Sequence, residues 1–372
     1  MKPETLAIHE PMLRRDGAVA PPIHMTTTFE HGALGTDLPH GFLYGRHGNP
    51  NVSDLETRLA ALEGGVDAIA FASGMGAASA MLTALKPGAR AVFHRDLYFD
   101  VKTLARTELA KKNVAVEFVD MRDMVAVHTA LTKPAALVWL ETPSNPQIDV
   151  IDIAAIAEAA NKAGAMTAVD GTFATPALQR PLALGADVVM HSATKFMGGH
   201  SDVQGGVLVT KAKDLADELR TIRKITGGIL SPFSAWLIAR GLQTLYCRMD
   251  KHCDNAQSLA EFLEAHPAVE KVRYPGLKSN PGHEIAARQM SRPGGIISVE
   301  IKGGQAGALA VASGLRIFVN ATSLGGVESL VEHRASLEGA DTTTPEGLLR
   351  LSVGLEHIDD LIADFQQALA AI

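Results

Sequence analysis

Two hydroxyl residues and a lysine, Ser192, Thr194 and Lys195, stand close together directly after the short run 187–190. Hydroxyl groups can bind an anion such as a phosphate. A lysine held beside apolar strand ends can have a lowered pKa and act as a nucleophile or a base, although it can also extend to solvent. We therefore take this segment as the first candidate for chemistry.

A turn of small residues, Ser73-Gly74-Met75, follows the apolar run 67–71 and opens a helical pattern. The free amides and the dipole of a helix N-terminus suit a phosphate. Taken alone, the segment fits a tight strand-to-helix turn that binds nothing better than it fits a phosphate site.

Polar residues also follow two further apolar runs. Asp170 closes the run 165–169, where an uncompensated charge would be costly, so it needs a cationic partner or caps a helix. Glu141 ends another run, and Asn145 lies between the two prolines of the next loop. Because ligands of open α/β sheets bind beyond the carboxyl ends of the strands, we expect these side chains to meet in one cleft.

Two types of reaction compete for Ser192-Ala193-Thr194-Lys195. The spacing fits Ser-x-x-Lys, the acylating serine motif of penicillin-binding proteins and β-lactamases. That motif is accompanied by Ser-Asp-Asn and Lys-Thr-Gly, whereas this chain has Ser201-Asp202-Val203, no Lys-Thr-Gly and no recognisable signal peptide. The other type uses a lysine that binds pyridoxal phosphate, with hydroxyls for the phosphate and a carboxylate for the pyridine nitrogen. This second interpretation gives every strand-end feature a function.

Short β-branched runs alternate with helical patterns from about residue 50 to 210, which predicts βα units around a mostly parallel sheet. Asp152 and Gly164 are expected to begin and close one of the helices. The predicted strands are 67–71, 89–93, 114–118, 136–140, 165–169, 187–190 and 206–209.

The two ends of the chain differ from this middle part. The first 45 residues have no sustained period and predict an irregular arm. A long helical stretch over 233–266 precedes a mixed pattern, with a closing helix from about His357, which predicts a smaller second α/β domain. Its expected strands are 269–274, 296–301 and 348–351.

Length and composition exclude several classes of protein. At roughly 150 residues per domain, the 372 residues predict two or three domains, and 47% hydrophobic with 20% charged residues indicates a folded chain. With 34 Lys and Arg against 41 Asp and Glu, we expect neither nucleic acid nor a membrane as partner. Cys247 and Cys253 form no disulfide framework or zinc motif, so we expect no metal site and a cytoplasmic location.

Taken together, these residues resemble those of the transsulfuration, or Cys/Met-metabolism, family of pyridoxal phosphate enzymes, from Pro21 to the C-terminus. The resemblance implies an α/β fold of type I, similar to aspartate aminotransferase, with a mostly parallel central sheet and a smaller C-terminal α/β domain. It divides the chain into an arm that contacts the neighbouring subunit (1–44), a cofactor domain (45–240) and a C-terminal domain (241–372). It also implies pyridoxal 5'-phosphate as cofactor, a small amino-acid substrate and a homotetramer whose active sites are shared across a dimer interface.

The resemblance assigns roles by position. Lys195 matches the lysine that binds the cofactor, Asp170 the carboxylate that pairs with the pyridine nitrogen, and Tyr98 the tyrosine stacked on the ring, and these three are the predicted catalytic residues. The predicted cofactor-binding residues, of which Tyr44 and Arg46 reach the neighbour's phosphate, are Lys195, Ser73, Gly74, Met75, Tyr98, Asp170, Ser192, Thr194, Tyr44, Arg46 and Asn145. The predicted substrate-binding residues are Arg350, which would clamp the α-carboxylate, Ser323, Glu141 and Asn145.

The activity implied is γ-elimination or γ-replacement on an amino acid derived from homoserine, homocysteine or cysteine, closest to cystathionine γ-synthase or γ-lyase. A cystathionine β-lyase, a methionine γ-lyase and an O-acylhomoserine sulfhydrylase are the alternatives. Tyr44-Gly45-Arg46 and Ser323-Leu324-Gly325-Gly326 disfavour an aminotransferase of the same fold. A binding module without activity would have lost Lys195, Asp170 or Arg350, and all three are present.

Five positions depart from the residues common in the family. Thr322 stands where enzymes acting on cystathionine often carry glutamate, and Asp100 where methionine γ-lyases carry cysteine. Asp100 either binds a cationic group at the substrate's distal end or turns to solvent. Gly171 and Gly198 replace asparagines, and Arg334 stands where proline is frequent, which predicts a subgroup with its own substrate.

Overall fold

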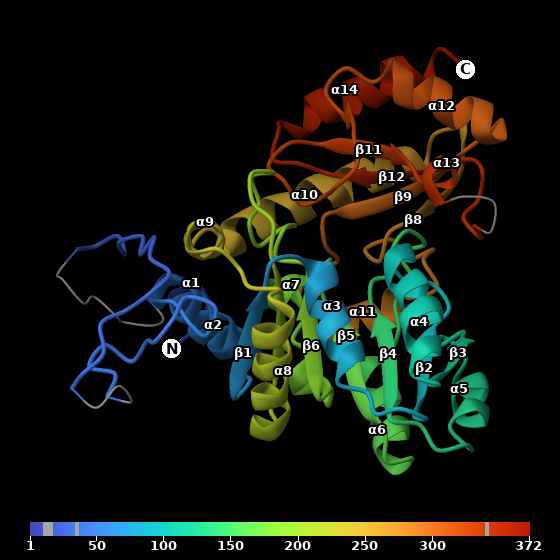
Figure 1. Ribbon diagram of the computed structural model, residues 1–372. Helices are drawn as coiled ribbons and strands as arrows, with labels where there is room; N and C mark the ends of the chain where they lie inside the picture. Colours follow the sequence, from blue (N-terminus) through green and yellow to red (C-terminus); the bar gives the residue numbers. More distant parts are fainter. Residues whose placement is uncertain (10–17, 34–36, 339–341) are drawn as a thin grey trace.

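The computed structural model describes residues 1–9, 18–33, 37–338 and 342–372. A larger α/β domain lies below a smaller one, and an N-terminal arm extends to one side (Figure 1). The colours of Figure 1 show that the larger domain is formed by the middle of the chain and the smaller one by its C-terminal third, as the sequence predicts.

Within the described ranges, a seven-stranded sheet forms the centre of the larger domain, in the order β1-β7-β6-β5-β4-β2-β3. β7 runs antiparallel to both neighbours, and the other pairs are parallel, so the mostly parallel sheet is confirmed. Each predicted strand lies within one residue of its observed bounds. The strands are β1 (Asp67–Phe71), β2 (Arg90–His94), β3 (Ala115–Val119), β4 (Leu137–Glu141), β5 (Met166–Asp170), β6 (Val188–His191) and β7 (Gly206–Thr210).

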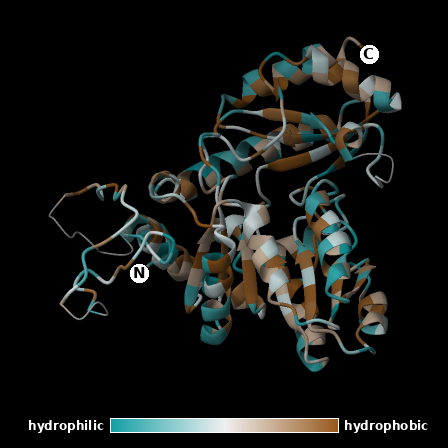
Figure 2. Ribbon diagram, in the orientation of Figure 1, coloured by the Kyte–Doolittle hydropathy of each residue, from teal (hydrophilic) through white to brown (hydrophobic). Residues whose placement is uncertain are grey.

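Helices cover both faces of this sheet, which explains why its inner strands are continuous apolar runs (Figure 2). Asp152 caps α6 as expected, since its carboxylate accepts a hydrogen bond of 3.0 Å from the amide of Ala155. The helices are α2 (Pro50–Glu63), α3 (Gly74–Thr83), α4 (Phe99–Lys111), α5 (Met124–Ala130), α6 (Ile153–Lys162), α7 (Thr175–Leu178), the 3₁₀ turn η1 (Pro181–Leu184) and α8 (Lys213–Thr226).

The predicted long helix is two helices, α9 (Pro232–Leu242) and α10 (Leu245–Glu264). Gly241, near the end of α9, packs so closely that a Cβ there would lie 2.3 Å from the carbonyl oxygen of Met197. Residues 243–244 separate α9, which packs against α2, from α10, which packs against β8 and α14.

The smaller domain contains a mostly antiparallel sheet in the order β10-β11-β12-β9-β8. Three of its strands are predicted correctly, whereas β10 and β11 are missed because one is two residues long and the other mixes apolar with charged residues. The elements are β8 (Val269–Arg273), α11 (His283–Gln289), β9 (Ile296–Ile301), α12 (Gly304–Gly314), β10 (Val319–Asn320), β11 (Leu330–His333), α13 (Ala335–Glu338), β12 (Leu348–Ser352) and α14 (Ile358–Leu369).

The N-terminal arm is not wholly irregular, because it contains the helix α1 (Pro3–His9). Several long-range hydrogen bonds fasten the arm to the larger domain. Among them, the amide of His24 donates to Asn51 Oδ1 at 2.8 Å, and Trp236 Nε1 donates to the carbonyl of Pro21 at 2.9 Å. α2 and α9 thus hold the base of the arm.

A buried carboxylate, Glu56 on α2, ties β1 to α8. Its Oε1 accepts from the Ala70 amide at 2.8 Å and from Arg223 Nη1 at 2.5 Å, and its Oε2 accepts from Arg220 Nη1 at 2.7 Å. Replacing Glu56 by Ala leaves Arg223 buried without a carboxylate, so we predict a loss of about 3 kcal/mol in the free energy of unfolding. Urea denaturation measures it.

Glu158→Ala is the matched control, because Glu158 forms an exposed ion pair with Lys162 one helical turn away. It should leave the unfolding midpoint unchanged. Equal midpoints for Glu56→Ala and the unmodified protein would contradict the assigned role of Glu56.

Candidate active site

The five strand ends that precede predicted site residues lie along one edge of the central sheet, facing the smaller domain (Figure 1). β1 and β6 are both antiparallel to β7 and therefore run in the same direction. The carboxyl ends of β1, β6, β5, β4 and β2 consequently lie on the same side. This is where open α/β sheets bind ligands.

Lys195 lies in the turn that follows β6, and its side chain is directed toward the smaller domain. Its Nζ donates a hydrogen bond of 3.1 Å to Ser323 Oγ. Burial, reinforced by the positive charge of Arg350, lowers the pKa of Lys195 to about 8. The Lys195 amine therefore loses its proton far more readily than the amine of an exposed lysine.

The loop containing Ser323 is held in a constrained conformation against the Lys195 segment. Ser323 has φ +122°, a value that side-chain-bearing residues rarely adopt. Gly325 has φ +78°, and a Cβ there would lie 2.6 Å from the Phe196 amide nitrogen. The Gly325 amide donates to Ser352 Oγ at 2.8 Å. Close packing thus fixes Ser323 beside Lys195.

Arg350, on β12, is buried and binds residues of both domains. Nη1 donates to Asn145 Oδ1 at 3.0 Å, and Nη2 donates to the Ser323 carbonyl at 2.9 Å and to Glu332 Oε2. Burial lowers the pKa of Arg350 to about 10. Its Nε has no hydrogen-bond partner among the described residues, so the guanidinium retains a buried donor for a ligand.

Asp170 is the last residue of β5. Its Oδ1 accepts hydrogen bonds from the amide of Thr172 at 2.9 Å and from Thr172 Oγ1 at 2.5 Å. Burial raises the pKa of Asp170, and the hydrogen bonds from Thr172 oppose that shift. Thr172 Oγ1 also accepts from the Ser192 amide at 2.8 Å. Thr172, which sequence reasoning missed, therefore links Asp170 to the hydroxyl-lysine segment, and its position two residues after a strand-ending aspartate could have indicated this turn.

Glu141 contacts the backbone of Tyr98. It is the last residue of β4 and the register partner of Asp170 on β5. Its Oε2 accepts a hydrogen bond of 2.8 Å from the Tyr98 amide. Burial, followed by the neighbouring Asp170 charge, raises the pKa of Glu141 well above its ordinary value. Glu141 thus fixes the backbone that carries the tyrosine.

Tyr98 precedes α4, and its half-buried ring meets Phe99 edge-on at 5.7 Å between ring centroids. Burial, together with hydrogen bonding to Asp100, raises the pKa of Tyr98 to about 12. The hydroxyl therefore keeps its proton at neutral pH. Asp100 is partly buried and close enough to contribute to this shift, which argues against a side chain simply turned to solvent.

The residues predicted to hold a phosphate come together at the start of α3. Ser73 Oγ caps the helix by accepting from the Gly76 amide at 3.0 Å. A Cβ at Gly74 would lie 2.9 Å from Ser192 Oγ, so only glycine allows the two segments to approach this closely. Thr194 Oγ1 accepts from the Gly205 amide at 3.0 Å, which holds the second hydroxyl segment alongside. Met75, the next residue of the turn, is partly buried.

Two of the unusual glycines are explained by their surroundings. A Cβ at Gly171 would lie 2.9 Å from Cε1 of His191, and one at Gly198 would lie 2.6 Å from Val203 Cγ1. The larger side chains common at these positions would require His191 and Val203 to move.

Tyr44 and Arg46 lie apart from this cluster in the single chain. Arg46 Nη1 donates to the carbonyl of Lys224 at 3.3 Å, and its guanidinium lies 5.5 Å from the centre of the Tyr44 ring. Tyr44 is 41% exposed. In the described part of the chain, no hydrogen bond or ion pair joins either residue to Lys195, Asp170 or Arg350.

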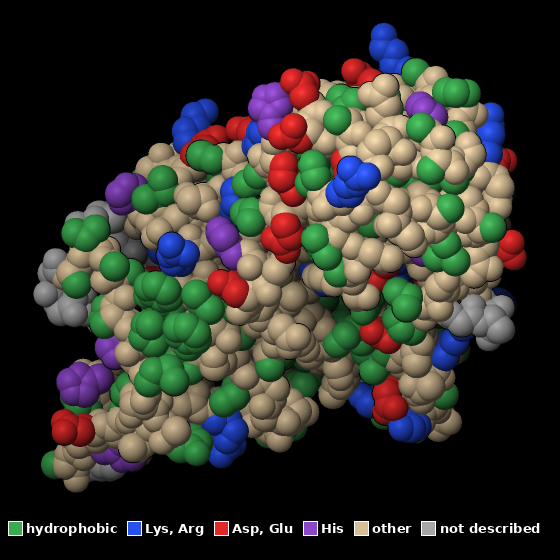
Figure 3. Space-filling view, turned by 90° about the horizontal axis from the view of Figure 1, so that it is seen from above, with side chains coloured by type: hydrophobic (Ala, Val, Ile, Leu, Met, Phe, Trp, Pro, Cys, Tyr) green, Lys and Arg blue, Asp and Glu red, His purple; other side chains and the backbone are tan. Residues whose placement is uncertain are grey.

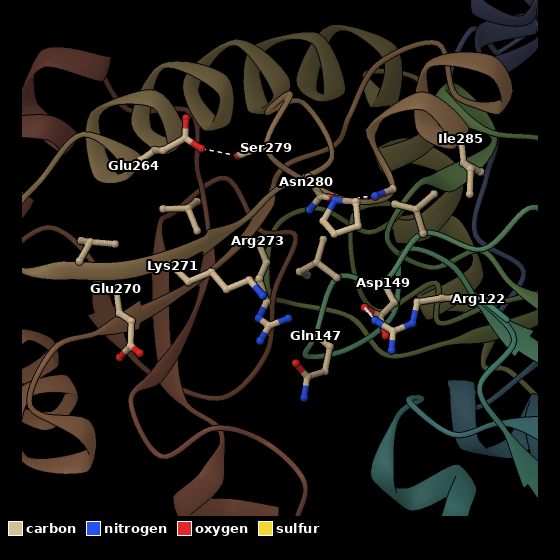
Figure 4. Close-up of a pocket in the computed structure, with 16 residues that line it drawn as sticks. Arg122, Gln147, Asp149, Glu264, Glu270, Lys271, Arg273, Ser279, Asn280 and Ile285 are labelled. Atoms are coloured by element: carbon tan, nitrogen blue, oxygen red, sulfur yellow. Dashed lines mark hydrogen bonds and ion pairs between the residues drawn. The ribbon is translucent and has the colours of Figure 1, made fainter.

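A separate cavity of about 480 Å³ lies at the seam between the domains (Figure 4). Arg122 and Asp149 of the larger domain face Lys271 and Arg273 of β8 across it. The described residues that line it include none of the predicted site residues, so this cavity is distinct from the strand-end cluster. A second cavity, of about 740 Å³, is lined by Leu97 and Phe99 on either side of Tyr98 in the sequence.

The strand-end residues fit pyridoxal phosphate. Asp170 is a buried carboxylate suited to a ring nitrogen, the start of α3 offers amides and Ser192 a nearby hydroxyl, and Lys195 supplies the amine. Among the described residues, no helix is both long and apolar enough to cross a membrane.

Comparison with known proteins agrees with this fit. The model of the family described as "Cys/Met metabolism PLP-dependent enzyme" matches residues 4–370. Cystathionine gamma-synthase of Mycobacterium tuberculosis (strain ATCC 25618 / H37Rv) is 47% identical, over 99% of this chain and 96% of that protein. L-methionine gamma-lyase of Pseudomonas putida is 44% identical, over 99% of this chain and 97% of that protein.

Solved structures are similar over the whole chain. The crystal structure of metB from Corynebacterium glutamicum has a TM-score of 0.97 and 43% identity, and covers 100% of this chain and 98% of its own. Cystathionine gamma synthase from Xanthomonas oryzae pv. oryzae, in complex with aminoacrylate and cysteine, has a TM-score of 0.96 and 40% identity, with the same coverage. The chain belongs to the Cys/Met metabolism family and is a pyridoxal-phosphate-dependent enzyme of transsulfuration.

Proposed function

We propose that this enzyme catalyses γ-replacement or γ-elimination at a homoserine- or homocysteine-derived amino acid and is closest in activity to cystathionine γ-synthase. The observation that carries the proposal is the bridge made by Ser323: its hydroxyl accepts from Lys195 Nζ at 3.1 Å, and its carbonyl accepts from Arg350 Nη2 at 2.9 Å. A base and a carboxylate-binding group on one bridging residue suit an α-amino acid, whose Cα lies one bond from its carboxylate.

The residues of the site would have separate roles toward the cofactor and the substrate. Asp170 would hold the cofactor's ring nitrogen, and Ser73, Gly74, Ser192 and Thr194 would surround its phosphate. When bound, pyridoxal phosphate supplies an electron-withdrawing ring that stabilises negative charge on the adjacent carbon. Lys195, with a lowered pKa, is suited to take the Cα proton and return it elsewhere. Lys195 would thus serve as both the general base and the general acid.

Arg350 and Tyr98 act at opposite ends of the substrate. Arg350 would hold the α-carboxylate through its guanidinium, whose Nε has no partner among the described residues. Tyr98 keeps its proton at neutral pH and can therefore donate it to a departing γ-group. Asp100, which contributes to the raised pKa of Tyr98, would orient that proton.

We also propose a homotetramer built from two dimers, in the cytoplasm. Figure 3 shows hydrophobic side chains gathered on the side of the arm. Met25 and Tyr44 near the N-terminus and Phe233 on α9 are exposed, so they add apolar surface to the chain. In such a dimer, Tyr44 and Arg46 would reach the partner's phosphate site. The two free thiols, Cys247 and Cys253, support a reducing compartment.

We predict that the purified protein is yellow and that Lys195→Ala abolishes both the visible absorption band and turnover, because the amine that binds the cofactor is lost. Absorbance spectra before and after borohydride treatment measure this. Lys211→Ala, which removes a lysine outside the cluster, should keep the band. A colourless protein that does not change when pyridoxal phosphate is added would contradict the cofactor assignment.

Substrate assays decide between the members of the family. We expect an O-acylhomoserine with cysteine to be converted faster than methionine, cysteine or cystathionine, measured as thioether formation and as release of a 2-oxo acid. Faster turnover of methionine, with release of a thiol, would instead favour the γ-lyase alternative.

Mixing two inactive variants tests the shared site. If Arg46 completes the partner's site, Lys195→Ala and Arg46→Ala subunits form hybrid dimers in which one site keeps both residues. Refolding an equimolar mixture should then recover about one quarter of the unmodified activity. Activity no higher than that of the separate variants would show that Arg46 acts within its own subunit or not at all.

A further inference from the structure

A second buried arginine, Arg334, lies between β11 and α13. It is linked to Arg350 through a shared carboxylate, that of Glu332. Glu332, Arg334 and Arg350 are each 3% exposed. Glu332 Oε2 accepts from Arg334 Nη1 at 3.1 Å and also from Arg350 Nη2. One carboxylate oxygen is therefore shared by two guanidinium groups.

Glu338 holds the opposite side of Arg334. Its Oε1 lies 3.2 Å from Arg334 Nε and 3.0 Å from Nη2. Its Oε2 accepts from the hydroxyls of Thr342 and Thr344, at 2.6 Å each. All three nitrogens of Arg334 thus have carboxylate partners, so this arginine is placed to act on its neighbours rather than to bind a ligand itself.

The charge balance explains what the second arginine can do. If Glu332 were paired with Arg350 alone, a buried carboxylate would largely neutralise the cation and compete for the donors that a substrate carboxylate needs. With Arg334 sharing the same oxygen, Glu332 is divided between two cations. Arg350 then keeps net positive charge, and its Nε is without a partner among the described residues.

We propose that Arg334 is a positioning residue that shares Glu332 and so keeps Arg350 available for the α-carboxylate of the substrate. This inference rests on the proposed role of Arg350. It also gives a function to one of the unusual residues of this chain, since proline is frequent at position 334 in the family.

The test compares four holoenzyme variants: Arg334→Met, Glu332→Gln, the double variant that combines them, and Glu338→Gln. We expect Arg334→Met to raise the KM of the amino-acid substrate about tenfold while kcat changes less than about threefold, because only carboxylate binding is weakened. In the double variant, no carboxylate neutralises Arg350, so KM should return to within about threefold of the unmodified value.

The rescue distinguishes charge balance from a merely structural role. If Arg334 only held its loop in place, removing Glu332 as well would leave KM high or raise it further, and the inference would be overturned. An unchanged KM in Arg334→Met would overturn it too. Glu338→Gln keeps Arg334 and directs its charge to Glu332, so its KM should be equal to or lower than that of the unmodified enzyme. A tenfold rise there would contradict the inference even if Arg334→Met failed to fold.

Carboxylate binding can be measured without turnover. Each holoenzyme is titrated calorimetrically with 4-(methylsulfanyl)butanoate, which has a carboxylate and no amine. The Kd values should follow the same order among the variants as the KM values. If the unmodified enzyme binds this probe but turns over no transsulfuration substrate, the proposed function fails while the inference about Arg334 is still tested. Equal affinities in the unmodified and Arg334→Met enzymes would count against Arg334 alone.

Discussion

The site depends on satisfying one buried guanidinium. A cation taken out of water is costly unless it is paired and hydrogen-bonded, and Arg350 is 3% exposed. Its partners come from different parts of the chain: Asn145 follows β4 in the larger domain, and Ser323 and Glu332 belong to the smaller one. Because Ser323 also accepts from Lys195, the requirement to satisfy Arg350 brings the reactive amine and the carboxylate-binding group together.

A second constraint acts on the two buried carboxylates at the ends of β4 and β5. Glu141 and Asp170 are register partners on adjacent parallel strands, and burial raises the pKa of both. Two neighbouring buried carboxylates cannot both remain ionised without a cation. Glu141 is engaged by the Tyr98 amide, so Asp170, held by Thr172, is left to pair with a positively charged group. A protonated pyridine nitrogen meets this requirement.

Much of this arrangement could be predicted from the sequence, because parallel strands buried on both faces form continuous apolar runs whose ends carry the polar residues. Asp170 and Lys195 stand out for this reason. Thr172 and Glu332 do not, since their importance arises from contacts with residues distant in sequence, such as Ser192 and Arg350. β11 could not be predicted for the same reason. Its residue Glu332 pairs with the buried Arg334 and Arg350 and so interrupts the apolar pattern of the strand.

We expect the amino-acid substrate to lie between Lys195 and Arg350, where the two domains meet. A crystal structure of the holoenzyme with a bound amino-acid substrate or unreactive analogue tests it most directly. We predict that the α-carboxylate accepts hydrogen bonds from the Arg350 guanidinium, with Cα facing Lys195 Nζ. A carboxylate held by other residues, with Arg350 still bound only to Asn145, Ser323 and Glu332, would contradict it.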